Sequence, residues 1–132
     1  MEAITKLSRD NEMIFDEKEA SILQYLPNLK ELNLSNNDII PAGLIEATEA
    51  CPLLEVLILD HTTSFGEFVF AAISSLKLKT LSANDSLIEP SAVPWFINMK
   101  MLTTLELRGS KPIAATDIDV IRKQRPGLQI DL

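Results

Sequence analysis

The most reactive side chains in the sequence are His61, which directly follows Asp60, and the single cysteine, Cys51. A histidine next to a carboxylate could perform acid–base chemistry, and a cysteine could act as a nucleophile. No sequence motif places a serine or cysteine nucleophile with His61. We therefore interpret His61 as a structural residue and Cys51 as a core residue at the end of a helix.

Motifs that hold cofactors or metals are also missing from the sequence. It contains no glycine-rich nucleotide loop, no His-Glu-x-x-His pair and no pairs of cysteines or histidines suited to zinc. We therefore expect no catalytic residues, no metal site and no cofactor, and we do not expect an enzyme.

Composition narrows the class of protein further. The chain has 132 residues, 46% of them hydrophobic, which predicts one folded domain. A net charge of −7 disfavours binding to nucleic acid or to anionic membranes. A lone cysteine and a polar amino-terminal segment favour a reducing compartment, so we expect the cytoplasm, with the nucleus as the alternative.

The sequence is organised by an internal repeat. Successive copies read PNLKELNLSNN (27–37), PLLEVLILDHT (52–62), LKLKTLSANDS (76–86) and KMLTTLELRGS (100–110). Their central apolar residues, continued to the carboxyl terminus, are Leu32, Leu57, Leu81, Leu105 and Ile130, at spacings of 24 or 25 residues. Stepping back from Leu32 leads to Leu7, in a degenerate first copy where Arg9 occupies an apolar position and is expected to face solvent.

Each copy alternates apolar and polar residues, which predicts a short strand, and the intervening segments have helical spacing. Helix-start signals are Pro41, Pro90, Pro94 and the capping patterns Asp16-x-x-Glu19 and Ser64-x-x-Glu67. The core residues expected in the intervening segments are Ile14, Ala20, Leu23, Leu26, Ile39, Leu44, Ala47, Cys51, Phe65, Val69, Ala72, Ile73, Leu76, Leu87, Val93, Phe96, Met99, Ile113, Ile118 and Ile121.

These elements predict an α/β fold in the form of a short right-handed solenoid of about five to six repeats. A parallel sheet would line the concave face, and the helices would form the convex face. The whole chain, 1–132, is expected to be one domain. Residues 1–26 would form a degenerate first repeat, 27–110 the regular repeats and 111–132 the terminal repeat.

The strings LPNLKELNLSNNDI and CPLLEVLILDHT resemble leucine-rich repeats. The stretch NDIIPAGLIEATEACPLLEVL resembles the cysteine-containing, ribonuclease-inhibitor-like subtype, which is common in the repeat domains of F-box substrate receptors. In that subtype a Cys-Pro pair closes each helix, as Cys51-Pro52 does here. The resemblance covers nearly the whole chain and implies partner binding on the concave face. No F-box-like segment precedes the repeats, so the ligase role is not carried over.

Strand residues between the core leucines are expected to point outward in columns. Val56 and Ile58 are apolar at positions where a polar residue is usual, and they could form the centre of a protein-binding surface. The alternative is that they only favour strand formation. Trp95 could bind a partner or pack against a neighbouring repeat. The candidate partner-binding residues are Glu31, Asn33, Val56, Ile58, Asp60, Ser82, Asn84, Glu106, Arg108 and Trp95.

Four polar residues occupy the position that is Asn in the repeat pattern. There they should hydrogen-bond to backbone groups of the loops that join the strands to the helices. These residues are Asn37, Thr62, Ser86 and Ser110.

Two functions remain open at this point. The first is an adaptor or recognition subunit that binds another protein, with substrate recognition in a ubiquitin ligase as a narrower version. The second is a structural assembly subunit or homo-oligomer that uses the exposed terminal edge strand, where the sequence ends at Leu132. The acidic balance also resembles that of small acidic leucine-rich nuclear proteins, but the sequence lacks their long acidic tail.

Overall fold

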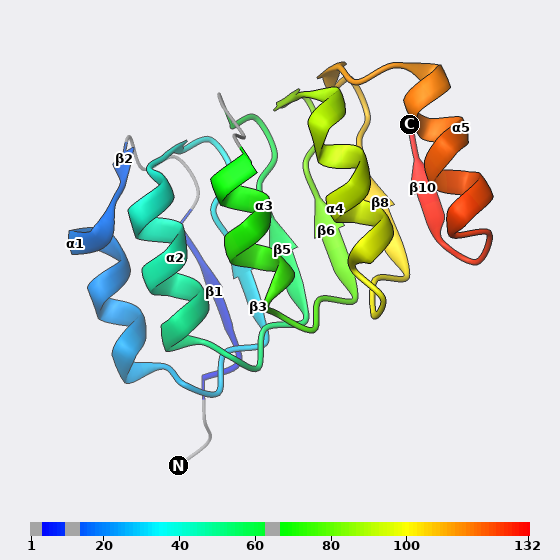
Figure 1. The fold of residues 1–132 in the computed structure, drawn as a ribbon. Helices are drawn as coiled ribbons and strands as arrows, with labels where there is room; N and C mark the ends of the chain where they lie inside the picture. The colour runs from blue at the N-terminus through cyan, green and yellow to red at the C-terminus, as the bar shows by residue number, and fades with distance from the viewer. Residues whose placement is uncertain (1–3, 10–13, 63–66) are drawn as a thin grey trace.

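A six-stranded parallel sheet forms one layer of the protein (Figure 1). The computed structural model describes residues 4–9, 14–62 and 67–132. Neighbouring strands follow one another along the chain. In order across the sheet they are β1 (Lys6–Ser8), β3 (Glu31–Asn33), β5 (Val56–Ile58), β6 (Thr80–Ser82), β8 (Thr104–Glu106) and β10 (Gln129–Asp131).

The first and last strands, β1 and β10, lie at opposite ends of the molecule, and the helices form a second layer, in a row on one side of the sheet (Figure 1). They are α1 (Glu17–Ala20) with the 3-10 turn η1 (Ser21–Tyr25), α2 (Pro41–Ala50), α3 (Glu67–Ser74), the 3-10 turn η2 (Pro90–Ala92) with α4 (Val93–Asn98), and α5 (Ala115–Gln124). No helix in the described part of the chain has the length and apolar character needed to cross a membrane.

Two pairs of very short strands lie in the connections from the sheet to the helices. β2 (Ile14–Phe15) pairs with β4 (Asp38–Ile39), and β7 (Leu87–Ile88) pairs with β9 (Lys111–Pro112). These two pairs join neighbouring connections and extend the stacking beyond the main sheet.

The core lies between the two layers. Leu32, Leu57, Leu81 and Leu105 occupy matching places in the four inner strands and are essentially fully buried. Ile130 in β10 is half-buried, because β10 is the last strand of the sheet. The expected strand register is confirmed. The expected burial of alternate side chains holds in β3, β5 and β8, whereas in β6 Ser82 is buried beside Leu81.

For two residues, the expectation that they belong to the core was wrong. Ile14 and Leu87 are 52% and 44% exposed, whereas the next residue in each case, Phe15 or Ile88, is buried. All four lie in two-residue strands, in which consecutive side chains point to opposite sides. The expected core residue Phe65 and the cap residue Ser64 lie outside the described residues.

Helix starts follow the expected signals. Pro41 is the first residue of α2, where its missing N–H costs no hydrogen bond. The Asp16 carboxylate accepts a hydrogen bond of 3.0 Å from the backbone N–H of Glu19 and so caps α1. Arg9 departs from the expectation, because it is only partly exposed and its guanidinium contacts the carboxylate of Glu19.

The polar residues at the Asn position of the repeat bond to the loop backbone, as expected. The Ser86 hydroxyl, for example, donates to the carbonyl of Leu59 (3.1 Å) and accepts from the backbone N–H of Thr62 (3.2 Å). The next residue in the column, Ser110, accepts from the N–H of Ser86 (3.1 Å) in the same way. The buried side chains of Ser86 and Ser110 therefore join neighbouring loops.

A left-handed turn follows several of the strands at one repeated position. Asn36, His61, Asp85 and Gly109 have φ values of 63°, 55°, 50° and 70°. Asparagine, aspartate and histidine tolerate this conformation better than other residues with side chains, and glycine adopts it without strain. The residue types at this position thus follow from the backbone of the turn.

We expect Gly109→Ala to lower the free energy of unfolding by about 1–2 kcal/mol, because alanine is strained at positive φ. The new methyl group would also lie 2.1 Å from Oδ1 of Asp85. Chemical denaturation measures the change. Gly127→Ala is the matched control, because the added methyl group would meet no atom of the described residues within 4 Å. Equal stability of the two variants would contradict the strain at Gly109.

Candidate partner-binding site

The face of the sheet turned away from the helices carries the side chains that alternate with the buried leucines. We call it the open sheet face. It is formed by two columns of strand residues in register, Lys6, Glu31, Val56, Thr80, Thr104 and Gln129, and Ser8, Asn33, Ile58, Ser82, Glu106 and Asp131. Neighbouring strands lie about 4.8 Å apart, so residues distant in the sequence form one continuous surface.

Val56 and Ile58 lie on β5, near the middle of the open sheet face, and both are half-buried. Val56 stands between Glu31 and Thr80 across the strands, whereas Ile58 has Asn33 and Ser82 as its neighbours. The structure therefore brings the candidate residues together as a small apolar centre with polar neighbours. Their binding of a partner stays a prediction.

A further column of candidates follows the strands and holds adjacent turns together. The Asp60 carboxylate accepts from the Ser82 hydroxyl (2.6 Å) and from the backbone N–H of Asn84 (2.8 Å). Asn84 repeats the pattern by accepting from the backbone N–H of Arg108 (2.7 Å). Ser35 does the same one step earlier, for the N–H of Asp60 (3.2 Å). Asp60 and Asn84 are thus engaged in stacking, and Ser82 is buried.

The charged candidates lie towards the two flanks of the open sheet face. Glu31 is on β3 and Glu106 on β8, with β5 and β6 between them. Arg108 lies beyond the end of β8 with its Nη2 3.5 Å from Oε1 of Glu106, an exposed pair that contributes little to stability. The face therefore has an apolar centre between carboxylates.

His61 and Asp60 do not form an acid–base pair. His61 sits in the left-handed turn, its side chain is 57% exposed, and its Nε2 lies 3.6 Å from Oδ2 of Asp85. Cys51 follows α2 and is buried, and burial raises the pKa of its thiol. Its Sγ donates to the carbonyl of Leu26 at 3.5 Å. Both residues occupy structural positions, and the described residues contain no group of three His, Cys, Asp or Glu suited to a metal.

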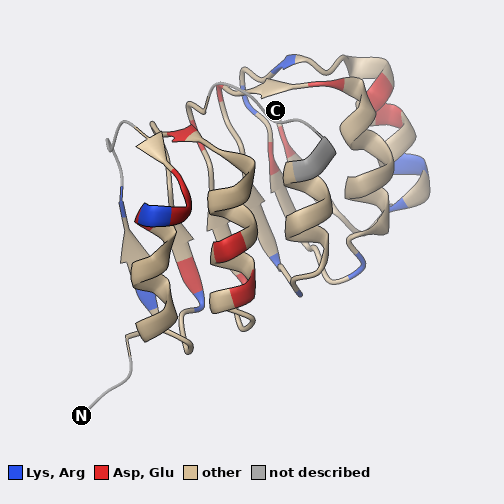
Figure 2. Ribbon diagram, turned by 60° about the vertical axis from the view of Figure 1, so that its left-hand side comes forward, with Lys and Arg blue, Asp and Glu red and all other residues tan. Residues whose placement is uncertain are grey.

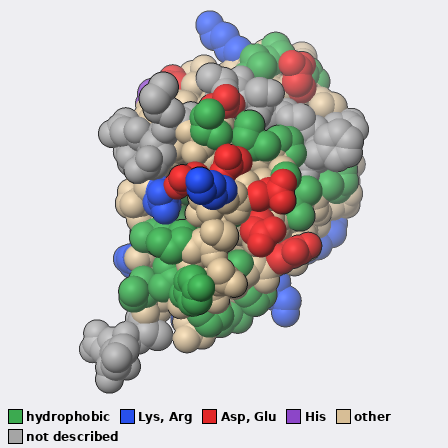
Figure 3. Space-filling model, turned by 90° about the vertical axis from the view of Figure 1, so that its left-hand side faces the viewer, with side chains coloured by type: hydrophobic (Ala, Val, Ile, Leu, Met, Phe, Trp, Pro, Cys, Tyr) green, Lys and Arg blue, Asp and Glu red, His purple; other side chains and the backbone are tan. Residues whose placement is uncertain are grey.

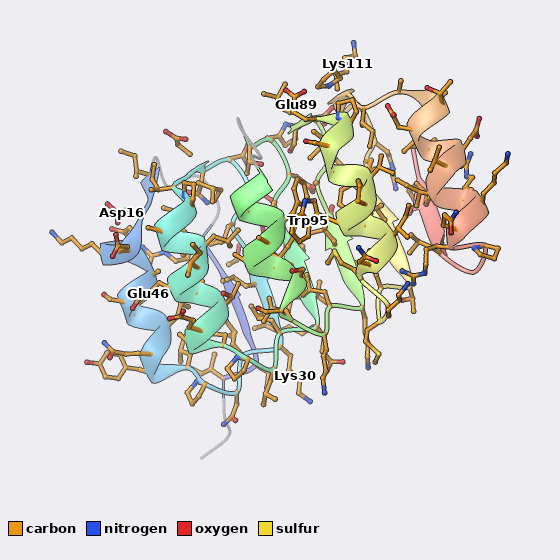
Figure 4. All side chains as sticks on the ribbon, viewed as in Figure 1. Asp16, Lys30, Glu46, Glu89, Trp95 and Lys111 are labelled. Atoms are coloured by element: carbon orange, nitrogen blue, oxygen red, sulfur yellow. The ribbon has the colours of Figure 1, made fainter. Side chains whose placement is uncertain are left out.

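Trp95 does not lie on the open sheet face. It belongs to α4, is half-buried and packs against the core. In Figure 4 its side chain lies between α3 and α4. The structure thus separates Trp95 from the other candidate residues by the thickness of the two layers.

Comparisons with known proteins agree with this architecture. No family model and no curated protein matches the sequence. Among solved structures, a leucine-rich-repeat protein of Leptospira interrogans is similar, with 25% sequence identity and a TM-score of 0.57. The match covers 86% of this chain and 27% of that one, so the chain spans about a quarter of the length of that protein. The fold is leucine-rich-repeat-like.

Leucine-rich-repeat-like stacking also creates a surface that the sequence analysis missed. Leu53 and Met101 are 50% and 52% exposed, in loops that lead from a helix back to a strand. Lys77 occupies the equivalent loop position between them. This surface could have been found from the sequence by aligning the copies at this loop position, which gives two apolar residues on either side of a lysine. The strand residues alone do not show it.

We expect Asp60→Ala to lower the free energy of unfolding by about 1–3 kcal/mol, because it leaves the N–H of Asn84 and the hydroxyl of Ser82 without their acceptor. Asp60→Asn should cost less, since its amide oxygen can still accept. Guanidinium denaturation gives the values. Asp119→Ala, at an exposed position on α5, controls for loss of a carboxylate. If Asp60→Ala lowered the free energy of unfolding no more than Asp119→Ala does, the hydrogen bonds of Asp60 would not stabilise the stacking of adjacent turns.

Proposed function

We propose that this protein is a non-enzymatic interaction module that binds a protein partner through the open sheet face. The observation that carries the proposal is the pair Val56 and Ile58, two half-buried apolar side chains at the centre of a face whose neighbouring positions are polar. Binding sites commonly combine such an apolar centre with a polar rim. We further propose that the sheet lines the concave side of a short right-handed solenoid of about five to six repeats.

The charges around the centre indicate the chemistry of the partner. Glu31 and Glu106 flank it on β3 and β8, and Asp131 continues the second column on β10. The basic residue within the columns is Lys6, on the edge strand β1, and Arg108 lies just beyond the end of β8. A partner with an apolar contact bordered by lysine or arginine would match this arrangement, and its association would slow as salt is added.

The candidate residues would then divide into two groups. Glu31, Asn33, Val56, Ile58, Glu106 and Arg108 would contact the partner. Asp60, Ser82 and Asn84 would support the strand ends through their hydrogen bonds, and Trp95 would stabilise the helical layer.

Single observations support a narrower subtype, a narrower role and a location for the protein. The Cys51-Pro52 pair supports the ribonuclease-inhibitor-like subtype and, through it, substrate recognition in a ubiquitin ligase. A lone reduced cysteine supports a location in the cytoplasm or nucleus. The similar protein of Leptospira interrogans supports protein interaction as the general function of this fold.

The test is affinity capture from a lysate of the source cells with the wild-type protein and with a Val56→Glu/Ile58→Arg double variant. We expect a protein that the wild type retains and the variant loses, because charge replaces the apolar centre. Circular dichroism checks that the variant is folded. The control, Ile45→Glu/Val120→Arg, makes the same changes at exposed apolar positions on α2 and α5. A partner lost by the control and kept by the first variant would place the interface on the helices and contradict the proposal.

A second candidate function is self-assembly through the amino-terminal end, which Figure 3 shows face-on. Four of the exposed large apolar residues belong to this end of the chain. Ile4 precedes β1, Ile14 lies in β2, and Ile22 and Tyr25 lie in η1, with Tyr25 75% exposed. The edge strand β1 lies at the same end. An apolar end next to a sheet edge is suited to stacking on another strand–helix unit, and β10 at the opposite edge could provide the strand.

We expect the wild-type protein to show a weight-average mass that rises with concentration if this end self-associates. Sedimentation velocity measures the mass, and Ile22→Lys/Tyr25→Lys should hold it at that of a monomer. Val120→Lys on α5 is the control, because Val120 is 47% exposed at a distance from this end. A wild-type protein that stays monomeric across the concentration range would exclude self-assembly.

A further inference from the structure

A cavity of about 340 Å³ opens at the edge of the molecule where the helices lead back into the strands. Its walls come from separate loops: Leu53 and Leu54 follow α2, Lys77 and Lys79 precede β6, and Met101 follows α4. Lys30, before β3, adds a further lysine to the lining, and Figure 4 shows it at the lower edge of the ribbon. The cavity is distinct from the open sheet face.

The inner part of this pocket is apolar. Leu54 is buried, whereas Leu53 and Met101 are about half exposed and stand on opposite sides of Lys77 in the column of equivalent loop residues. Exposed apolar side chains that line a concave site are favourable contacts for an apolar group of a ligand. A volume at the lower end of the usual range for ligand pockets suits one or two side chains rather than a large cofactor.

The rim of the pocket is basic in a protein whose net charge is −7. Three lysines line it with a single carboxylate, that of Glu55. Lys79 is paired with Glu55, with Nζ 2.6 Å from Oε2, and this pairing lowers the pKa of the Glu55 carboxyl. Lys30 and Lys77 add positive charge beyond that pair. Figure 2 shows basic segments gathered along this lower edge, while α2 carries acidic ones.

We propose that this pocket binds an acidic–apolar peptide segment of a partner protein. A leucine-like side chain of the segment enters between Leu53 and Met101, and carboxylates beside it on the segment face Lys30 and Lys77. The charge complementarity selects an acidic segment, and the small apolar volume requires an apolar residue within it. The open sheet face, with carboxylates at its flanks, would repel the same segment.

Fluorescence anisotropy with a fluorescein-labelled peptide of alternating Glu and Leu tests the proposal. Two matched peptides, one with Gln for Glu and one with Ser for Leu, separate the contribution of charge from that of apolar contact. We expect the Glu–Leu peptide to bind more tightly than either, and its affinity to fall as salt is added. Amide chemical shifts of Leu54 and Met101 should move on titration.

The Lys30→Glu/Lys77→Glu variant should bind the Glu–Leu peptide about tenfold more weakly, since attraction becomes repulsion at two exposed positions. Leu53→Ser should weaken binding without any change in charge. The control, Arg122→Glu/Lys123→Glu, makes the same charge change at exposed positions on α5 and should leave binding unaltered.

Three results would overturn the proposal. The first is equal binding of the Glu–Leu and Gln–Leu peptides, and the second is an equal loss of affinity in the pocket variant and the α5 control. The third is binding of sodium dodecanoate in the pocket with no binding of the Glu–Leu peptide, which would assign the site to a fatty acid. Circular dichroism of each variant confirms that a loss of binding is not a loss of fold.

Discussion

Every strand–helix unit of this protein depends on hydrogen bonds to the unit beside it. The carbonyl of Lys30 accepts from the N–H groups of both Glu55 and Val56, at 2.8 and 2.9 Å, and the carbonyl of Glu55 in turn accepts from Lys79 and Thr80. A three-residue strand cannot satisfy its own backbone, and it cannot bury its leucines alone. The spacing of 24 or 25 residues is therefore the constraint on the whole fold, since it brings equivalent donors and acceptors opposite one another.

This constraint also decides which side chains can serve binding. Near the strand ends, Asp60 and Asn84 are engaged with the backbone of the next turn, and His61 is present because its turn has a positive φ. The outward side chains of β5 are apolar and cannot form such hydrogen bonds, and the backbone there bonds within the sheet. The fold therefore does not require a particular residue type at positions 56 and 58. Val56 and Ile58 can serve the binding of a partner instead.

Features that repeat along the chain could be predicted from the sequence, whereas features that depend on how separate loops meet could not. The leucine register, the helix starts and the polar loop column were predictable because each repeats at a fixed spacing and has one physical cause. Phe15 and Ile88 were missed because a two-residue strand is too short to show alternation, although the buried Ile39, which pairs with Phe15 in the neighbouring unit, points to the first of them. The lysine-rimmed pocket was missed because it depends on how the loops converge in space.

The two proposed binding surfaces are close enough to influence one another. Lys30 directly precedes Glu31, the first residue of β3, and Lys79 directly precedes Thr80, the first residue of β6, so a pocket residue and a residue of the open sheet face are adjacent along the chain. Successive residues of an extended chain are about 3.3 Å apart, well within a screening length of about 8 Å at physiological salt. A basic partner on the sheet face would make the pocket more attractive to an acidic segment, and the segment would favour the basic partner to the same extent, because coupling between sites is reciprocal. The coupling requires no change in shape, and it should weaken as salt is added, whereas a coupling that arose from movement of the units would persist.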